Sequence, residues 1–110
     1  MLIHCVDESA VRHGAIDANV ASSLEAWIEE MTRRGVLLHG GRLRLTSEAT
    51  TIRVRDEELL ITDGPFAETK EQVAGYDLIE CADLDEAIAV ASRHPTAGLG
   101  TIEVRPVLEL

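Results

Sequence analysis

The chain has 110 residues and a mass of 12.0 kDa, which fits one domain, here residues 1–110, and leaves no room for a second core. Its 20 acidic and 10 basic residues give a formal net charge of -10, so its surface repels nucleic-acid phosphates. Two cysteines are too few for the disulfide framework of a small secreted domain, and no apolar run approaches the roughly 20 residues of a membrane-spanning helix. We therefore expect a cytoplasmic protein that binds neither nucleic acid nor membrane.

A strand and an amphipathic helix are predicted in the first third of the chain. Residues 1–6 are apolar and partly β-branched, which favours a strand, and a loop is expected from there to Gly14. From Asp17 to Arg34, apolar residues recur in steps of three and four, the spacing of one helical face. Gly35 is suited to end this helix because glycine readily adopts the left-handed conformation of a C-terminal cap. The predicted buried stripe consists of Val20, Leu24, Trp27, Ile28 and Met31.

The middle of the chain predicts a strand followed by a β-hairpin. The strand starts at Val36, and the double glycine at 40–41 indicates a bulge or a close approach of another backbone. Residues 50–55 alternate between polar and apolar side chains, and residues 59–62 return as their partner strand after a turn. The apolar residues expected to face inward on the first of these strands are Ile52 and Val54.

A strand, a helix and a strand are predicted in the last third. Residues 75–81 favour a strand, and residues 101–107 favour the final one. Asp83 is placed to cap the helix between them, with Glu86 as its reciprocal partner. The helix ends at His94 because the residue before a proline disfavours helical conformation. The predicted buried face of this helix consists of Leu84, Ala87, Ile88 and Ala91.

This order of elements predicts an α+β fold. Two β-α-β units flanking a hairpin match a ferredoxin-like antiparallel sheet with two helices on one face and a β-hairpin insert. The helices leave the other face of the sheet uncovered, and a domain of 110 residues buries modest area. We therefore expect this chain to form a homodimer.

Residues 62–72 (Thr-Asp-Gly-Pro-Phe-Ala-Glu-Thr-Lys-Glu-Gln) form a distinctive segment. The segment resembles the signature of the YCII-related family, also called the DGPF-domain family after the tetrapeptide at 63–66. The similarity covers residues 35–107 well and the N-terminal third loosely. It implies a dimeric α+β barrel, in which two ferredoxin-like sheets pack face to face, and a His-Asp pair in a cleft. The chain departs from the family pattern near Gly41 and at Asp77, where a second aromatic residue is usual, so the chemistry of any pocket there has changed.

Asp63 is the first candidate for catalysis, because a carboxylate at a strand end before a Gly-Pro turn can face a cleft and act as a general base. His39 and His4 are its candidate partners, since an imidazole changes charge near neutral pH. An Asx-type turn at Asp63 and structural roles for both histidines remain the competing interpretation. His13 and His94 are interpreted as a loop residue and a helix-end residue without a chemical role.

Candidate ligand-binding residues surround the same turn, with a solvated loop and packing of the aromatic residues as the alternatives. No ligand spacing typical of a metal site recurs, and the sequence holds neither a phosphate loop nor a dinucleotide fingerprint, so we expect no metal and no cofactor. The candidate ligand-binding residues are Gly64, Pro65, Phe66, Lys70 and Tyr76.

Two functions are compatible with these features. The first is a small-molecule-binding protein that acts as a cofactor-independent lyase, isomerase or dehydrochlorinase-like enzyme through an Asp-His pair. The second is a non-catalytic dimeric module that senses a ligand or binds a protein. Some members of the family that the chain resembles lie beside genes for alternative sigma factors, which implies a regulatory role for the second alternative.

Overall fold

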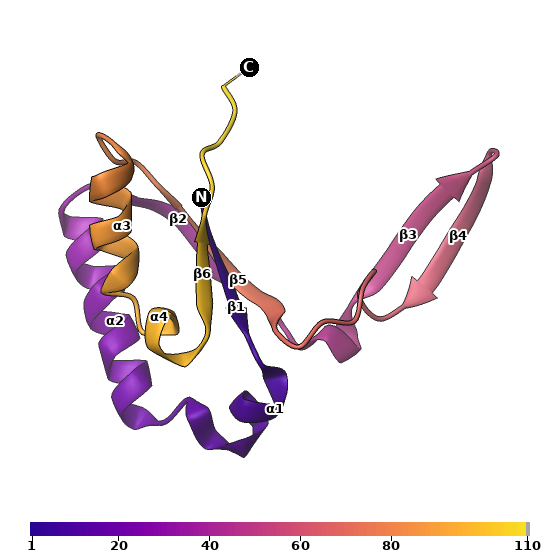
Figure 1. Cartoon of the computed structure of the whole chain (residues 1–110), viewed down its shortest axis with the longest axis horizontal. Coiled ribbons are helices and arrows are strands. Elements are labelled where there is room, and N and C mark those ends of the chain that lie inside the picture. The colour runs from indigo at the N-terminus through magenta and orange to yellow at the C-terminus, as the bar shows by residue number, and fades with distance from the viewer. Residues whose placement is uncertain (110) are drawn as a thin grey trace.

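The protein contains two separate β-sheets (Figure 1). The computed structural model describes residues 1–109, apart from the side chains of His13 and Ala15. Four strands form an antiparallel sheet in the order β2-β5-β1-β6, and β3 pairs with β4 in a sheet of their own. The strands are β1 (Leu2–Val6), β2 (Leu37–Arg42), β3 (Thr50–Arg55), β4 (Glu58–Asp63), β5 (Gln72–Ile79) and β6 (Thr101–Val104). The helical segments are α1 (Glu8–Ala10), η1 (Val11–Ala15), α2 (Ala18–Arg33), η2 (Thr46–Glu48), α3 (Leu84–Ser92) and α4 (Thr96–Leu99).

The extent of helix α2 confirms the prediction from apolar spacing. The Asp17 side chain caps its start by accepting a hydrogen bond from the Val20 N–H, and Gly35 follows its end at φ +72°. Of the predicted buried stripe, Trp27 and Met31 are buried, whereas Ile28 is 42% exposed, so the predicted face was partly wrong. The prediction of a simple loop before α2 was wrong, because α1 and η1 occupy that segment.

Helix α3 is capped as predicted but buries a different face. The Asp83 side chain accepts from the Glu86 N–H at 2.8 Å, and the Glu86 carboxylate accepts from the Ala82 N–H at 2.7 Å. Val90 is buried, whereas Leu84 and Ile88 are 59% and 50% exposed, so the predicted face was partly wrong. The buried face of α3 is turned towards α2. The indole N–H of Trp27 on α2 donates a hydrogen bond to the Val90 carbonyl at 2.9 Å.

The helices pack on one face of the four-stranded sheet, and the hydrophobic core lies between them. Side chains alternate across the sheet, so Leu2 and His4 of β1 face the helices while Ile3 and Cys5 face away. The strand order and antiparallel pairing are compatible with a ferredoxin-like α+β fold. The core consists of Leu2, Trp27, Met31, Val36, Val90 and Ala91.

The hairpin β3-β4 projects away from the rest of the chain (Figure 1). Asp56 and Glu57 turn the chain with positive φ angles, as predicted for a tight hairpin. The expectation that Ile52 and Val54 face inward was wrong, since they are 64% and 59% exposed and the hairpin has no sheet or helix beneath it. The projection raises the radius of gyration to 15.9 Å, against about 13 Å for a globular domain of this length.

The described helices are too short or too polar to cross a membrane.

Candidate functional site

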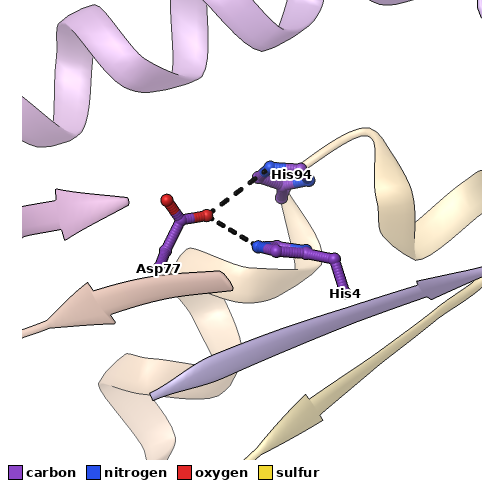
Figure 2. A group of neighbouring side chains, drawn as sticks. All are labelled: His4, Asp77 and His94. Atoms are coloured by element: carbon purple, nitrogen blue, oxygen red, sulfur yellow. Dashed lines mark hydrogen bonds and ion pairs between the residues drawn. The ribbon is translucent and has the colours of Figure 1, made fainter. Parts of the chain in front are cut away.

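Three polar side chains meet on the helix-covered face of the sheet (Figure 2). His4 lies on the central strand β1, Asp77 on the neighbouring strand β5, and His94 in the turn between α3 and α4. The pairing of Leu2 with Asp77 sets β1 and β5 in register, so the carboxylate comes beside His4. All three residues are buried, with exposed fractions of 6–8%.

His4 holds one oxygen of the Asp77 carboxylate. Its Nε2 lies 2.6 Å from Asp77 Oδ2, the short distance of a charge-assisted hydrogen bond. Because a carboxylate only accepts, the imidazole donates from Nε2, and in neutral His4 Nδ1 carries the lone pair. Nδ1 is buried without a hydrogen-bond partner among the described residues. The pair therefore fixes the orientation of the carboxylate.

His94 is held as a neutral ring with its proton on Nε2. The Thr96 backbone N–H donates to His94 Nδ1 at 3.0 Å, so Nδ1 must accept and the single ring proton of neutral His94 sits on Nε2. Nε2 lies 3.8 Å from Asp77 Oδ2, beyond hydrogen-bond distance. The ring stacks on His4 with centroids 4.1 Å apart and meets Trp27 edge-on at 4.7 Å.

The surroundings of His94 disfavour its protonated form. The pKa of His94 is lowered to about 4, chiefly by burial and secondly by the neighbouring His4, while Asp77 acts in the opposite direction. The imidazole is therefore uncharged at neutral pH and keeps the Nε2 proton that its hydrogen bond with Thr96 requires.

Gly40 makes room for the second carboxylate oxygen. It pairs with Asp77 across β2 and β5, and a Cβ at this position would occupy the place of Asp77 Oδ1. The double glycine predicted a bulge or a close approach of another backbone. The approach at Gly40 is made mainly by the Asp77 side chain, with the Tyr76 carbonyl 3.2 Å from the added Cβ, and the bulge in β2 lies earlier, between Leu37 and His39. Oδ1 has no hydrogen-bond partner among the described side chains. Unlike His4 Nδ1, which is fully buried, Oδ1 remains accessible to solvent.

The three residues form part of the wall of a cavity of about 560 Å³ between the sheet and helix α2. Most of the lining is aliphatic and comes from β1, η1, α2 and the segment after β2. Such a cavity accommodates a small ligand with a few polar groups at fixed places. Its aliphatic lining includes Val6, Val20, Leu24, Ile28, Leu43 and Leu99.

The same cluster is the candidate position for a cation, because the three ligand atoms lie within 4.8 Å of one another. A two-histidine, one-carboxylate set suits several transition metals. The Thr96 N–H opposes this use, because it places the proton of His94 on Nε2, the nitrogen that would have to bind the ion. The observed hydrogen bonds therefore fit an acid-base centre better than a metal centre.

The structure places the sequence-predicted residues in three different surroundings. His4 belongs to the cluster. Asp63 ends the projecting hairpin with an exposed side chain that has no hydrogen bond or ion pair within residues 1–109. His39 lies on the other face of the sheet, where its Nδ1 is 2.9 Å from the Tyr76 hydroxyl and the two rings stack. Assignment of Asp63 as a catalytic residue stays a prediction, now without an imidazole in contact with it.

The predicted ligand-binding residues are also divided. Tyr76 borders the cavity, although its ring lies on the other face of the sheet against His39. Gly64 is held by the Ala49 carbonyl and the Thr51 hydroxyl, with φ +91°, and anchors the base of the hairpin. Packing of Phe66 on the core was a wrong expectation, because its side chain is 80% exposed, and Pro65 and Lys70 lie on the same surface segment.

Two members of the cluster were not predicted as site residues. Asp77 was recognised only as a departure from the family pattern, although a carboxylate on the inward face of a strand is itself a signal of a site. His94 carries no such signal, because a histidine before a proline is equally suited to ending a helix. The side chain of His13, interpreted as a loop residue, lies outside the described part of the chain.

Comparison with known proteins gives one family and one clear relative. A model of the YCII-related domain matches residues 1–110. An uncharacterized protein of Rhizobium meliloti (strain 1021) is 42% identical over 93 residues, which cover 83% of this chain and 75% of that protein.

Proposed function

The chain belongs to the YCII-related domain family, and on this premise we propose that it binds a small molecule and transfers a proton within it without a cofactor. In this proposal Asp77 is the base, and His4 is the positioning residue that orients it. The observation that carries the proposal is the asymmetry of the Asp77 carboxylate. Oδ2 is bound by His4 at 2.6 Å, while Oδ1 stays free beside Gly40 at the wall of an apolar cavity.

The geometry suits general-base catalysis. A base must present a free lone pair at a fixed place, and the bond to His4 removes the rotational freedom of the carboxylate while Oδ1 keeps its acceptor capacity. The aliphatic cavity excludes most water from a bound ligand, so a carboxylate there competes less with solvent. Removal of a proton from carbon, followed by its return elsewhere or by loss of a leaving group, gives an isomerase or a lyase.

Exchange of carbon-bound hydrogen with solvent tests this function. We expect the protein in D₂O to exchange protons next to the carbonyl of small apolar ketones, followed by NMR, and we expect Asp77→Asn to lower the rate at least about 100-fold. Asparagine keeps the size of the side chain and the acceptor for His4, but it cannot take the proton. A melting curve of each variant separates loss of chemistry from loss of fold.

Asp85→Asn is the matched control, because it removes a carboxylate from the exposed start of α3, outside the cavity. It should leave the exchange rate unchanged. Asp63→Asn tests the candidate chosen from the sequence, and a loss as large as that of Asp77→Asn would move the base to the hairpin. Exchange that survives Asp77→Asn at the full rate contradicts the proposal.

A homodimer is also proposed, supported by the apolar side chains that one copy leaves uncovered. Ile52, Val54, Leu59 and Ile61 share one side of the hairpin by register and are 59–64% exposed. Contiguous exposed aliphatic side chains typically mark a surface that another protein covers. This surface also favours the second candidate function, a dimeric module that senses a ligand or binds a protein without turnover.

We expect sedimentation at micromolar concentration to show a species of twice 12.0 kDa. The double variant Ile52→Ser/Ile61→Ser should shift it towards the monomer, because it removes two aliphatic side chains from the exposed surface. Thr51→Ser/Thr62→Ser, on the opposite side of the same hairpin, is the matched control. A 12.0 kDa species in the unmodified protein would exclude the dimer.

A further inference from the structure

Two hydrogen-bonding groups at the cavity have no role in the proposal so far, namely the Nε2–H of His94 and the guanidinium of Arg42. From their positions we infer that the ligand is a small, largely apolar carbonyl compound that also carries a carboxylate. The carbonyl oxygen accepts from His94, and the carboxylate pairs with Arg42. This inference rests on the proposed function and adds the chemical class of the ligand to it.

His94 is placed to bind an oxygen that becomes negative. Its Nε2–H has no acceptor within hydrogen-bond distance among the described residues, because Asp77 Oδ2 lies 3.8 Å away. Nε2 is not sealed from solvent, so the cavity reaches it. A neutral imidazole that donates to a carbonyl stabilises the enolate oxygen without supplying a full charge.

The bond changes at this centre balance without any further reactant. Asp77 Oδ1 takes a proton from the carbon next to the carbonyl, and the electron pair of that C–H bond forms the C=C bond of an enolate. The carbonyl π electrons move to the oxygen, which accepts a hydrogen bond from the His94 Nε2–H. Once the carboxyl proton on Oδ1 has exchanged with D₂O, delivery of a deuteron to the same carbon restores the carbonyl compound, which accounts for solvent exchange.

Arg42 supplies the second anchor. It lines the cavity and has no ion pair among the described residues, whereas its neighbour Arg44 is bound by both oxygens of Glu48 at 2.8 Å. Glu8, which also lines the cavity, accepts from the Thr46 N–H and hydroxyl. In a chain with a net charge of -10, an unpaired guanidinium at a cavity wall is the group best suited to an anionic ligand.

The strand fixes the spacing between the two anchors. Gly40 and Arg42 lie two residues apart on β2, so they face the same side of the sheet and are separated by roughly 6.5–7 Å along the strand. Gly40 opposes Asp77, so the base and the cation lie at successive positions of one face. A chain of several carbons between the carbonyl and the carboxylate spans this distance, and the aliphatic lining covers it.

Glu25 of α2 also lines the cavity and has no ion pair among the described residues. Its charge repels an anionic ligand, so removing the Glu25 charge should change ligand binding in the opposite direction to removing the Arg42 charge. Loss of the Arg42 charge weakens an acid, and loss of the Glu25 charge strengthens it. A ligand without a carboxylate responds to neither.

The test compares 4-oxopentanoate and 6-oxoheptanoate with their methyl esters, measuring binding by calorimetry and proton exchange by NMR in D₂O. We expect at least one acid to bind about 10-fold more tightly than its ester. Arg42→Gln should remove that difference, and Glu25→Gln should increase it. Equal binding of each acid and its ester, no binding of either acid, or no effect of Arg42→Gln on the acids would overturn the ligand class.

A second readout separates His94 from a structural role. His94→Phe should lower kcat for exchange by about 100-fold with a small change in KM, because the donor acts on charge that develops during the reaction. His94→Gln keeps an N–H near the same place and should recover part of the rate. Equal loss in both variants, with unchanged melting temperatures, overturns the donor role.

The outcomes distinguish the inference from the proposed function. Exchange that needs Asp77 but is equal for acids and esters keeps the proposed function and overturns the anionic ligand. Arg42-dependent binding of an acid without exchange supports the anionic ligand and overturns proton transfer.

Discussion

Replacement of Gly40 by alanine is expected to destabilise the fold by about 2 kcal/mol and to abolish proton exchange. The added Cβ would occupy the position of Asp77 Oδ1, while the carbonyl of Tyr76 lies 3.2 Å from it on the same side. The carboxylate must then rotate away from His4, or β2 must move away from β5. Urea unfolding measures the first effect, and exchange in D₂O measures the second.

A double-mutant cycle isolates the contact that causes this loss. In an Asp77→Ala background the carboxylate is gone, so Gly40→Ala should cost much less than in the unmodified chain. Gly98→Ala in helix α4 is the matched control, since a Cβ there meets nothing within 4 Å and alanine favours a helix. An unchanged cost of Gly40→Ala in the Asp77→Ala background would assign the strain to the Tyr76 backbone instead.

Acidification is expected to weaken the fold through His94. The unfolded chain binds a proton at this residue below about pH 6.5, whereas burial holds the pKa of folded His94 at about 4. Between these values the unfolded state binds more protons, so stability falls as the pH drops from about 7 to 4. The largest loss for this shift is about 3 kcal/mol, and we expect about 2 kcal/mol because the cavity admits water.

The variant His94→Gln should remove this part of the acid sensitivity, which urea unfolding at several pH values will measure. His4 and Asp77 are the titratable groups that face the ring, and both remain in the variant. His39→Gln, on the opposite face of the sheet, should keep the slope of the unmodified chain. A His94→Gln protein that loses the same stability between pH 6.5 and 4 would contradict the assignment.

The two expectations concern opposite sides of one carboxylate. Gly40 controls the space around Oδ1, and His4 and His94 control the surroundings of Oδ2. The site therefore accepts little change. One methyl group added at Gly40 would displace the Asp77 carboxylate, and one proton added to His94 would place a charge beside it.

Local patterns predicted most of the elements of this protein. The apolar steps in α2, the Asp83 cap of α3 and the glycine after α2 depend on interactions within a few residues, so the sequence alone displays them. The segment at 62–72 identified the family because it preserves the order of residue types around a turn.

Local patterns did not predict which apolar side chains are buried, because burial depends on what covers a side chain. Alternation in β3 showed that Ile52 and Val54 share one side, but they stay exposed because the hairpin stands apart from the four-stranded sheet. The exposed Phe66 and the rotated face of α3 have the same origin, since burial is set by neighbours that are distant in sequence.

The candidate site was decided by the tertiary structure. His4 and Asp77 are 73 positions apart, and the register of β1 against β5 brings them together, whereas Asp63 lies on the separate hairpin. The turn after α3 then lays His94 on His4, and Gly40 reaches Asp77 through the pairing of β2 with β5. The sequence by itself determined the two long helices, the strands and the family, because these follow from near neighbours and residue order. The meeting of one carboxylate with two imidazoles follows from strand register and helix packing, which long-range pairing determines.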